Sequence, residues 1–95
     1  MAAYVIADVH VKDPERYQKY RAMVPASLEK YGGKFLVRGG KVDKLEGSRE
    51  PGRVVVLEFP TIEQARRWYD SPEYREARAL RLSTADSHLI IVEGA

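Results

Sequence analysis

The stretch that most constrains the fold is residues 53–69. Its first half, Val54–Phe59, is a short run of β-branched, aliphatic and aromatic residues ended by Pro60, which predicts a central strand. Thr61 and Gln64 follow at the spacing of a capping box, which marks the start of a helix. Apolar side chains then recur at helical intervals: Ile62, Ala65, Trp68 and Tyr69. A buried strand therefore passes directly into an amphipathic helix, so the fold combines a sheet with helices packed on it.

The length of 95 residues predicts a single domain, residues 1–95, with a thin core. A chain of this size buries only about two-thirds of the surface that its unfolded form exposes. Hydrophobic residues make up 44% of the sequence and charged residues 32%, so the chain is globular and has apolar surface left for a partner. We therefore expect it to associate with itself.

Composition also excludes several classes of function. The chain has no cysteine, which excludes disulfides, thiolate nucleophiles and cysteine zinc sites. Its 16 basic and 14 acidic residues are interspersed and leave a net charge of +2, without a basic tract for nucleic acid. No apolar run approaches the ~20 residues of a membrane span, and no signal sequence is recognisable. We expect a cytoplasmic protein that binds neither nucleic acid nor membrane.

The first third of the chain predicts a strand and a long helix. Side chains of Tyr4–Val11 alternate in polarity, which is typical of a strand. Asp13-Pro14 forms a helix start, with the acid as N-cap and the proline at the first helical position. Pro25 lies inside this helix and removes a backbone donor, so we expect a kink or two abutting segments. The helix has one apolar stripe, made of Tyr17, Tyr20, Val24, Leu28 and Tyr31.

The remaining elements complete a β-α-β-β-α-β order. Lys34–Arg38 predicts the second strand, and polar Lys41–Gly52 predicts a hairpin excursion in which Val42–Glu46 forms a short edge strand. Ser71-Pro72 starts a last helix, and His88–Glu93 predicts the last strand. Chains of this order usually close as an α+β, ferredoxin-like antiparallel sheet in the spatial order 4-1-3-2, with the helices on one face.

The two faces of this sheet differ in composition. The face expected beneath the helices is apolar and holds Val5, Ala7, Val9, Val55, Leu57, Leu89 and Ile91. The opposite face mixes aliphatic with polar residues: Tyr4, Ile6, Asp8, His10, Leu36, Arg38, Val54, Val56, Glu58, His88, Ile90 and Val92. Leaving its aliphatic area in water is unfavourable by about 25 cal/mol per Å². We therefore expect two copies to stack these faces as a homodimer.

Several stretches resemble one known family. They span nearly the whole chain: Tyr31–Gly40, Leu45–Gly47, Arg53–Pro60, Ala65–Tyr74, Arg81 and Val92–Gly94. On these residues the sequence resembles the domain of unknown function 1330 family, within the dimeric α+β barrel superfamily. The resemblance implies the ferredoxin-like fold and dimerisation through the sheet faces. It implies no reaction, because relatives in the superfamily include cofactor-independent monooxygenases, muconolactone isomerase-like enzymes and haem-handling proteins.

Arg38 and Glu58 are the first candidates for chemistry. They are expected on the same face of two neighbouring strands, where they would form a charge pair. In one interpretation the pair is structural and fixes the arrangement of the sheet. In the other, Arg38 binds an anionic or enolate-like oxygen and Glu58 is a catalytic residue that orients it or accepts a proton.

His10 is a second catalytic candidate, because a histidine near neutral pH can act as a general base. His10 and His88 are the only histidines and are expected close together on the same face, with Asp8 beside them as a ligand-binding candidate. Two histidines placed by an inferred register are too few to predict a metal site. We expect neither a metal nor another cofactor.

Trp68, Tyr69 and Tyr74 are either core residues or the wall of a ligand pocket, since aromatic residues at helical spacing serve both roles. We expect the arginines of the last two helices to lie on solvent-exposed helix faces; in the alternative they form an anion-binding patch. They are Arg66, Arg67, Arg75, Arg78 and Arg81. RNA recognition is rejected, because the third strand has no aromatic residues on its open face for base stacking.

The sequence thus predicts a homodimeric protein that binds or transforms a small organic molecule without a cofactor. The expected site lies on the open face near Arg38 and Glu58, with His10 toward the strand end. The alternative is a non-catalytic binding or interaction module in which Arg38 and Glu58 form a purely structural pair.

Overall fold

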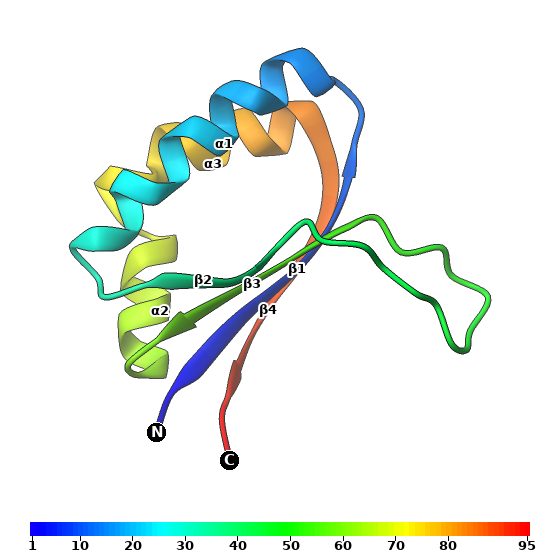
Figure 1. Cartoon of the computed structure of the whole chain (residues 1–95). Helices are drawn as coiled ribbons and strands as arrows, with labels where there is room; N and C mark the ends of the chain where they lie inside the picture. The colour runs from blue at the N-terminus through cyan, green and yellow to red at the C-terminus, as the bar shows by residue number, and fades with distance from the viewer.

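The computed structural model describes residues 1–95, and its elements follow the order β-α-β-β-α-α-β (Figure 1). The elements are β1 (Ala3–Val11), α1 (Pro14–Glu29), β2 (Lys34–Arg38), β3 (Arg53–Phe59), α2 (Ile62–Tyr69), α3 (Pro72–Thr84) and β4 (Ala85–Glu93). The three helices lie on one side of the sheet. The predicted α+β class is confirmed. No helix is both long and apolar enough to span a membrane.

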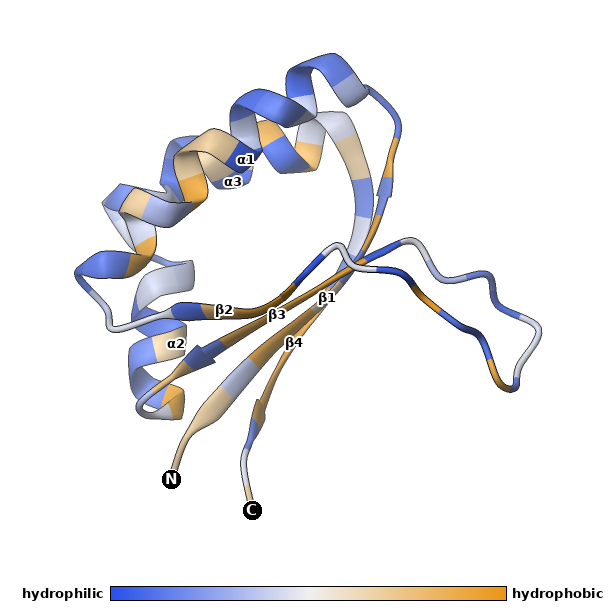
Figure 2. Ribbon diagram, in the orientation of Figure 1, coloured by the Kyte–Doolittle hydropathy of each residue, from blue (hydrophilic) through white to orange (hydrophobic).

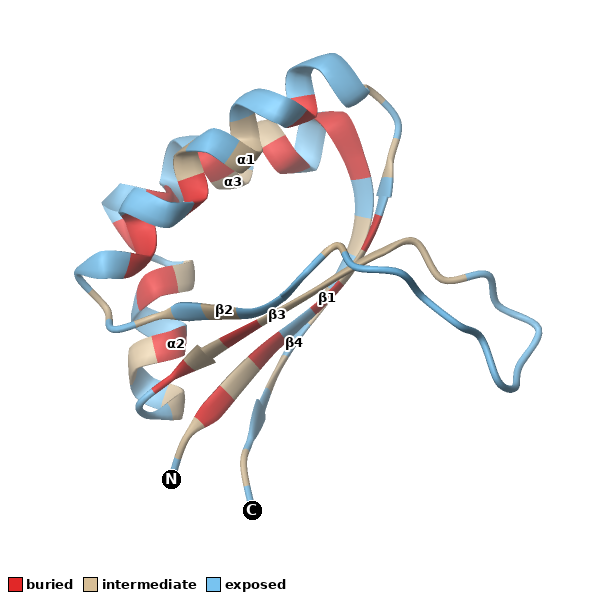
Figure 3. Ribbon diagram, in the orientation of Figure 1, coloured by how far each residue is buried: buried red, intermediate tan, exposed pale blue.

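The sheet has the strand order β2-β3-β1-β4, and all neighbouring strands are antiparallel, as predicted. β1 lies in the middle, where Ile6 pairs with Val56 on one side and with Ile90 on the other. Along β1, buried residues alternate with more exposed ones. The alternation in the sequence therefore translates directly into a covered and an open face, as the burial colours of Figure 3 show.

The predicted helix starts are confirmed by their caps. The side chains of Asp13, Thr61 and Ser71 each accept a hydrogen bond from the backbone N–H three residues later. Each cap satisfies a donor that has no partner within its own helix. These local signals determine where the three helices begin.

The core lies between the helices and the sheet. Trp68 is 1% exposed, and its Nε1 donates to Ser27 Oγ at 3.0 Å. Its ring lies 4.0 Å from that of Tyr74 and 5.5 Å from that of Phe59, measured between centroids. The interpretation of Trp68 as a core residue is confirmed. Figure 2 shows that hydrophobic residues are concentrated along the strands, with further ones on the helices.

Several local details differ from the predictions. Of the two alternatives expected at Pro25, two abutting segments are excluded, because α1 runs through Pro25 as one helix. Val42–Glu46 forms no strand; the chain between β2 and β3 is a long, largely exposed loop that extends away from the body in Figure 1. β4 begins at Ala85, earlier than predicted, directly after α3. Pairing with β1 explains the earlier start, because Ala85 is opposite Val11.

The open face of the sheet leaves aliphatic side chains accessible in the single chain. Ile6 is 37% exposed, Ile90 is 58% exposed and Val92 is 42% exposed. Apolar residues gathered on one sheet face indicate a surface that is covered by a partner.

Candidate functional site

Arg38 and Glu58 do not face each other. A β-bulge between Phe35 and Val37 shifts the register of β2, so Arg38 lies opposite Val55, a residue of the helix-covered face. Glu58 remains on the open face, where Lys34 Nζ approaches its carboxylate at 3.0 Å. The predicted Arg38–Glu58 pair is therefore wrong, because one extra residue in a strand moves the side chains after it to the other face.

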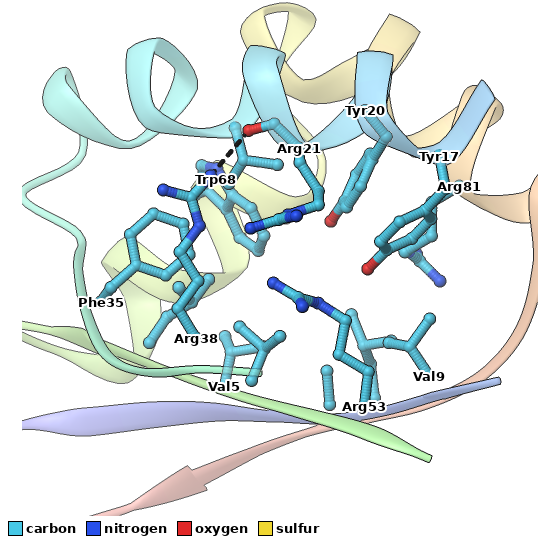
Figure 4. Close-up of a pocket in the computed structure, with 15 residues that line it drawn as sticks. Val5, Val9, Tyr17, Tyr20, Arg21, Phe35, Arg38, Arg53, Trp68 and Arg81 are labelled. Atoms are coloured by element: carbon cyan, nitrogen blue, oxygen red, sulfur yellow. Dashed lines mark hydrogen bonds between the residues drawn. The ribbon is translucent and has the colours of Figure 1, made fainter. Parts of the chain in front are cut away.

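The Arg38 side chain instead joins β2 to α1. Its guanidinium lies 4.3 Å from the centroid of the Phe35 ring, and Nη2 donates to the backbone oxygen of Arg21 at 2.8 Å (Figure 4). In a regular helix this oxygen would accept a hydrogen bond from the N–H of residue 25, four positions later. Residue 25 is a proline and has no N–H. Arg38 thus replaces the missing helical hydrogen bond, which explains how α1 continues through a proline.

A cavity of about 30 Å³ lies between the helices and the sheet, with room for about two water molecules (Figure 4). Fifteen residues line it, and eleven of them are hydrophobic, including Tyr17, Tyr20, Phe35 and Trp68. The remaining four are all arginines: Arg21, Arg38, Arg53 and Arg81. We call this space the arginine cavity. None of its lining residues is acidic, so the protein supplies no counter-ion there.

The four arginines come from four different elements and differ in how their donors are used. Arg81 is buried, and its Nε donates to the Tyr74 hydroxyl at 3.3 Å while Nη1 donates to Ser87 Oγ. In contrast, the Nε atoms of Arg21 and Arg53 are buried without a hydrogen-bond partner. Buried donors without partners are unusual in folded proteins. The Nε atoms of these two guanidiniums can therefore donate hydrogen bonds to a ligand.

Gly39 makes room for one of these guanidiniums. The residue has a φ of 69°, and a Cβ placed on it would overlap the guanidinium of Arg53. Its N–H donates to the Val54 carbonyl at 2.8 Å, which fixes the turn next to β3. A glycine is needed here both for the left-handed backbone and for the space.

Two tyrosines of α1 add hydroxyl groups to the arginine cavity. Burial raises the pKa of Tyr20. Burial also raises the pKa of Tyr17, although the charge of Arg53 partly opposes this. Both phenols therefore remain protonated at neutral pH and above. The cavity offers cationic and neutral donors but no carboxylate or imidazole that could act as a base.

The other predicted site residues on the open face lie apart from this cavity. His10 Nε2 is 3.6 Å from Asp8 Oδ1, and that same oxygen accepts the Gly52 N–H at 2.7 Å. His88 is opposite Asp8 in the β1–β4 register. The chain has no group of three histidine or acidic residues arranged to hold a metal ion.

Of the predicted ligand-binding residues, Arg38 and Trp68 line the arginine cavity. Tyr74 is fully buried behind it, where its hydroxyl contacts Tyr20 and Arg81. Tyr69 is half-buried and packs against the core, with the Arg78 guanidinium 5.0 Å from its ring centroid. The aromatic residues therefore divide between the core and the cavity wall.

Sequence reasoning missed Arg21 and Arg53 and misjudged Arg81. Arg53 could have been found, because it shares the strand parity of Val55 and Leu57, which face the helices. Arg81 was predicted on a solvated helix face but is 3% exposed, since α3 packs against α1 and β4. Its position three residues after Arg78 gave no signal for this burial.

The fold is shared with several solved structures. The RPA0582 protein of Rhodopseudomonas palustris, of unknown function, is 23% identical with a TM-score of 0.79, over 99% of this chain and 82% of that chain. A dimeric ferredoxin-like protein of unknown function from Jannaschia sp. CCS1 is 11% identical with a TM-score of 0.75, over 99% of this chain and 100% of that chain. SnoaB, a cofactor-independent oxygenase from Streptomyces nogalater, is 13% identical with a TM-score of 0.66, over 99% and 93%.

At these identities the similarity establishes the fold alone. No curated protein sequence matches the chain. The family described as Domain of unknown function (DUF1330) matches residues 2–95, which confirms the resemblance found in the sequence motifs. The chain therefore belongs to the DUF1330 family.

Proposed function

We propose that the protein is a homodimer that binds a small organic anion in the arginine cavity. The observation that supports this most strongly is the set of four lining arginines without a single lining acid. A guanidinium that is removed from water without a counter-ion is unfavourable, and it is stabilised by an anion that also accepts its hydrogen bonds. The free donors of Arg21 and Arg53 are the natural partners for such an anion.

The size and lining of the cavity restrict the ligand. A space of about 30 Å³ accommodates only a small head group such as a carboxylate. Arg38 is the most exposed of the four arginines, and a longer ligand would have to displace its side chain from the Arg21 oxygen. Carboxylates and guanidiniums match in geometry, because a guanidinium can donate two parallel hydrogen bonds to one carboxylate.

The homodimer is part of the same proposal. The open face presents exposed Ile6, Ile90 and Val92, and the Jannaschia protein of the same fold is described as dimeric. Stacking two open faces would bury these aliphatic residues and leave the helices, with the arginine cavities beneath them, on the outside of the dimer.

Catalysis by a cofactor-independent oxygenase mechanism is the second candidate. SnoaB has this activity and the same fold, and a cationic cavity would stabilise the enolate or phenolate form of a substrate. Such an enzyme also needs a group that removes the substrate proton, and the arginine cavity has no carboxylate or imidazole. Binding of a ligand that is already ionised in water is therefore the better supported function.

Paired carboxylates and amides test the proposal. Calorimetric titration with acetate and benzoate should give binding, whereas the neutral analogues acetamide and benzamide should not bind. Arg53→Gln should abolish the binding of both carboxylates, because it removes the Arg53 guanidinium together with its unpartnered Nε. Arg66→Gln is the matched control, since Arg66 is exposed and outside the cavity. Equal binding of acids and amides, or unchanged binding to Arg53→Gln, would refute the proposal.

A further inference from the structure

The hydroxyl groups of Tyr20 and Tyr74 lie 2.8 Å apart, and either oxygen could donate to the other. The direction of this hydrogen bond decides whether the cavity contains a free acceptor or a free donor. The surrounding contacts determine that direction.

The contact with Arg81 determines whether the Tyr74 oxygen is a donor or an acceptor there. The Arg81 Nε lies 3.3 Å from that oxygen, and a guanidinium can only donate, so the Tyr74 oxygen is an acceptor in this contact. Tyr74 is fully buried, and its hydroxyl has no other partner than Arg81 and Tyr20. A buried hydroxyl proton without an acceptor is unfavourable. The Tyr74 proton is therefore donated to the Tyr20 oxygen.

This assignment leaves the proton of Tyr20 without a partner in the protein. Tyr20 lines the arginine cavity, and Figure 4 shows its hydroxyl pointing into the space between Arg21 and Arg53. Hydrogen bonds arranged in series polarise each other, so the charge of Arg81 strengthens the donor at the far end of the chain. The series runs from Arg81 through Tyr74 to Tyr20.

We propose that Tyr20 is a ligand-binding residue that donates its hydroxyl proton to the anion held by Arg21 and Arg53, and that Tyr74 and Arg81 are the positioning residues that orient it. This inference rests on the proposed anion binding and specifies the ligand further. The arginine donors and the Tyr20 proton need an acceptor oxygen, and the arginines without a lining acid also need a negative charge. A carboxylate or an enolate supplies both, whereas an alcohol or an amide is neutral.

Removal of single hydroxyl groups tests the inference. Tyr20→Phe should weaken acetate binding roughly 10- to 100-fold, the range expected for one hydrogen bond to a charged group. Tyr74→Phe keeps the Tyr20 donor but removes its orientation, so a smaller loss is expected. Tyr31→Phe is the control, because the Tyr31 hydroxyl is bound to Glu73 away from the cavity. Circular dichroism spectra establish that each variant is folded.

A second measurement covers the case in which Tyr20→Phe does not fold. Ortho-fluorotyrosine placed at position 20 keeps the hydroxyl and reports on it by fluorine NMR. Its resonance should shift when acetate is added and stay unchanged with acetamide, and the same label at position 31 should not respond to either.

The outcomes separate this inference from the function on which it rests. If wild type binds no carboxylate, the proposed function and the role of Tyr20 both fail. If wild type binds acetate and Arg53→Gln does not, but Tyr20→Phe binds as tightly as wild type, only the role of Tyr20 is refuted. A fluorine resonance at position 20 that does not shift during acetate binding also refutes the role of Tyr20.

Discussion

At the scale of single residues, the backbone oxygen of Arg21 connects Pro25 with Arg38. Pro25 cannot donate to this oxygen, and Arg38 donates to it at 2.8 Å from a neighbouring strand. The missing donor could be predicted from the sequence, because proline always lacks the N–H. Its replacement could not be predicted, because the direction of the Arg38 side chain depends on a bulge two residues earlier.

A double-mutant cycle at these two positions tests the connection. Arg38→Ala should reduce the free energy of unfolding by about 1–3 kcal/mol, because it leaves the Arg21 oxygen without a donor. In the Pro25→Ala variant the restored N–H of residue 25 donates to the Arg21 oxygen. Arg38→Ala should therefore reduce the free energy of unfolding by at least about 1 kcal/mol less in this variant than in wild type. Urea unfolding measures all four variants. Additive effects of the two substitutions would contradict this account.

Tyr17 and Tyr20 predict how stability depends on alkaline pH. Burial raises the pKa of both phenols in the folded protein, whereas in the unfolded chain they titrate at the ordinary value of 10.0. The folded state therefore holds these protons more tightly. Their contribution to stability is complete below pH 10 and is lost as the pH rises above it, since the unfolded chain ionises first.

Urea midpoints measured from about pH 8 to about pH 11 check this sign. The midpoint should fall above pH 10 in wild type and fall less steeply in Tyr20→Phe. A wild-type midpoint that rises over this range would be inconsistent with protonated, buried phenols.

At the scale of elements, local signals predicted the helices and strands well. Capping residues and proline placed the helix starts, alternation placed β1, and a β-branched and aromatic run ended by Pro60 placed β3. The predicted Arg38–Glu58 pair was wrong for one reason, which is the bulge in β2. Arg38 follows Phe35 by three positions, so strict alternation puts the two side chains on opposite faces, whereas the bulge brings both to the helix-covered face.

Gly39 gives a test of how β2 and β3 shape the cavity. Gly39→Ala should destabilise the protein by about 1–2 kcal/mol, the penalty for a side chain on a left-handed residue, and should displace Arg53. Gly40→Ala is the control, because a Cβ there meets no atom within 4 Å. Thermal unfolding and acetate titration of both variants check the two effects. Wild-type behaviour of Gly39→Ala would contradict the assigned role.

At the scale of the whole molecule, the order of elements and the polarity of the two sheet faces predicted the fold. Both follow from patterns that a ferredoxin-like chain must have to bury one face of its sheet under helices. The same open face predicts assembly. It has exposed aliphatic residues near the sheet centre, where Ile6 and Ile90 are directly paired.

Substitution of an open-face residue tests the dimer. Ile90→Asp should give a folded monomer, because Ile90 is 58% exposed in the single chain and a charge there opposes stacking of two sheets. Leu82→Asp is the control, since Leu82 is equally apolar and 62% exposed but lies on α3. Light scattering should find a dimer for wild type and Leu82→Asp. A monomeric wild type would refute dimerisation through this face.

The most direct test of the central claim is a crystal structure of the protein with para-bromobenzoate, whose bromine is located by anomalous scattering. We expect the carboxylate within hydrogen-bond distance of Arg53 and Tyr20, between the helices and the sheet. A ligand bound instead on the open face beside Glu58 or His10, with the arginine cavity unchanged, would contradict the central claim.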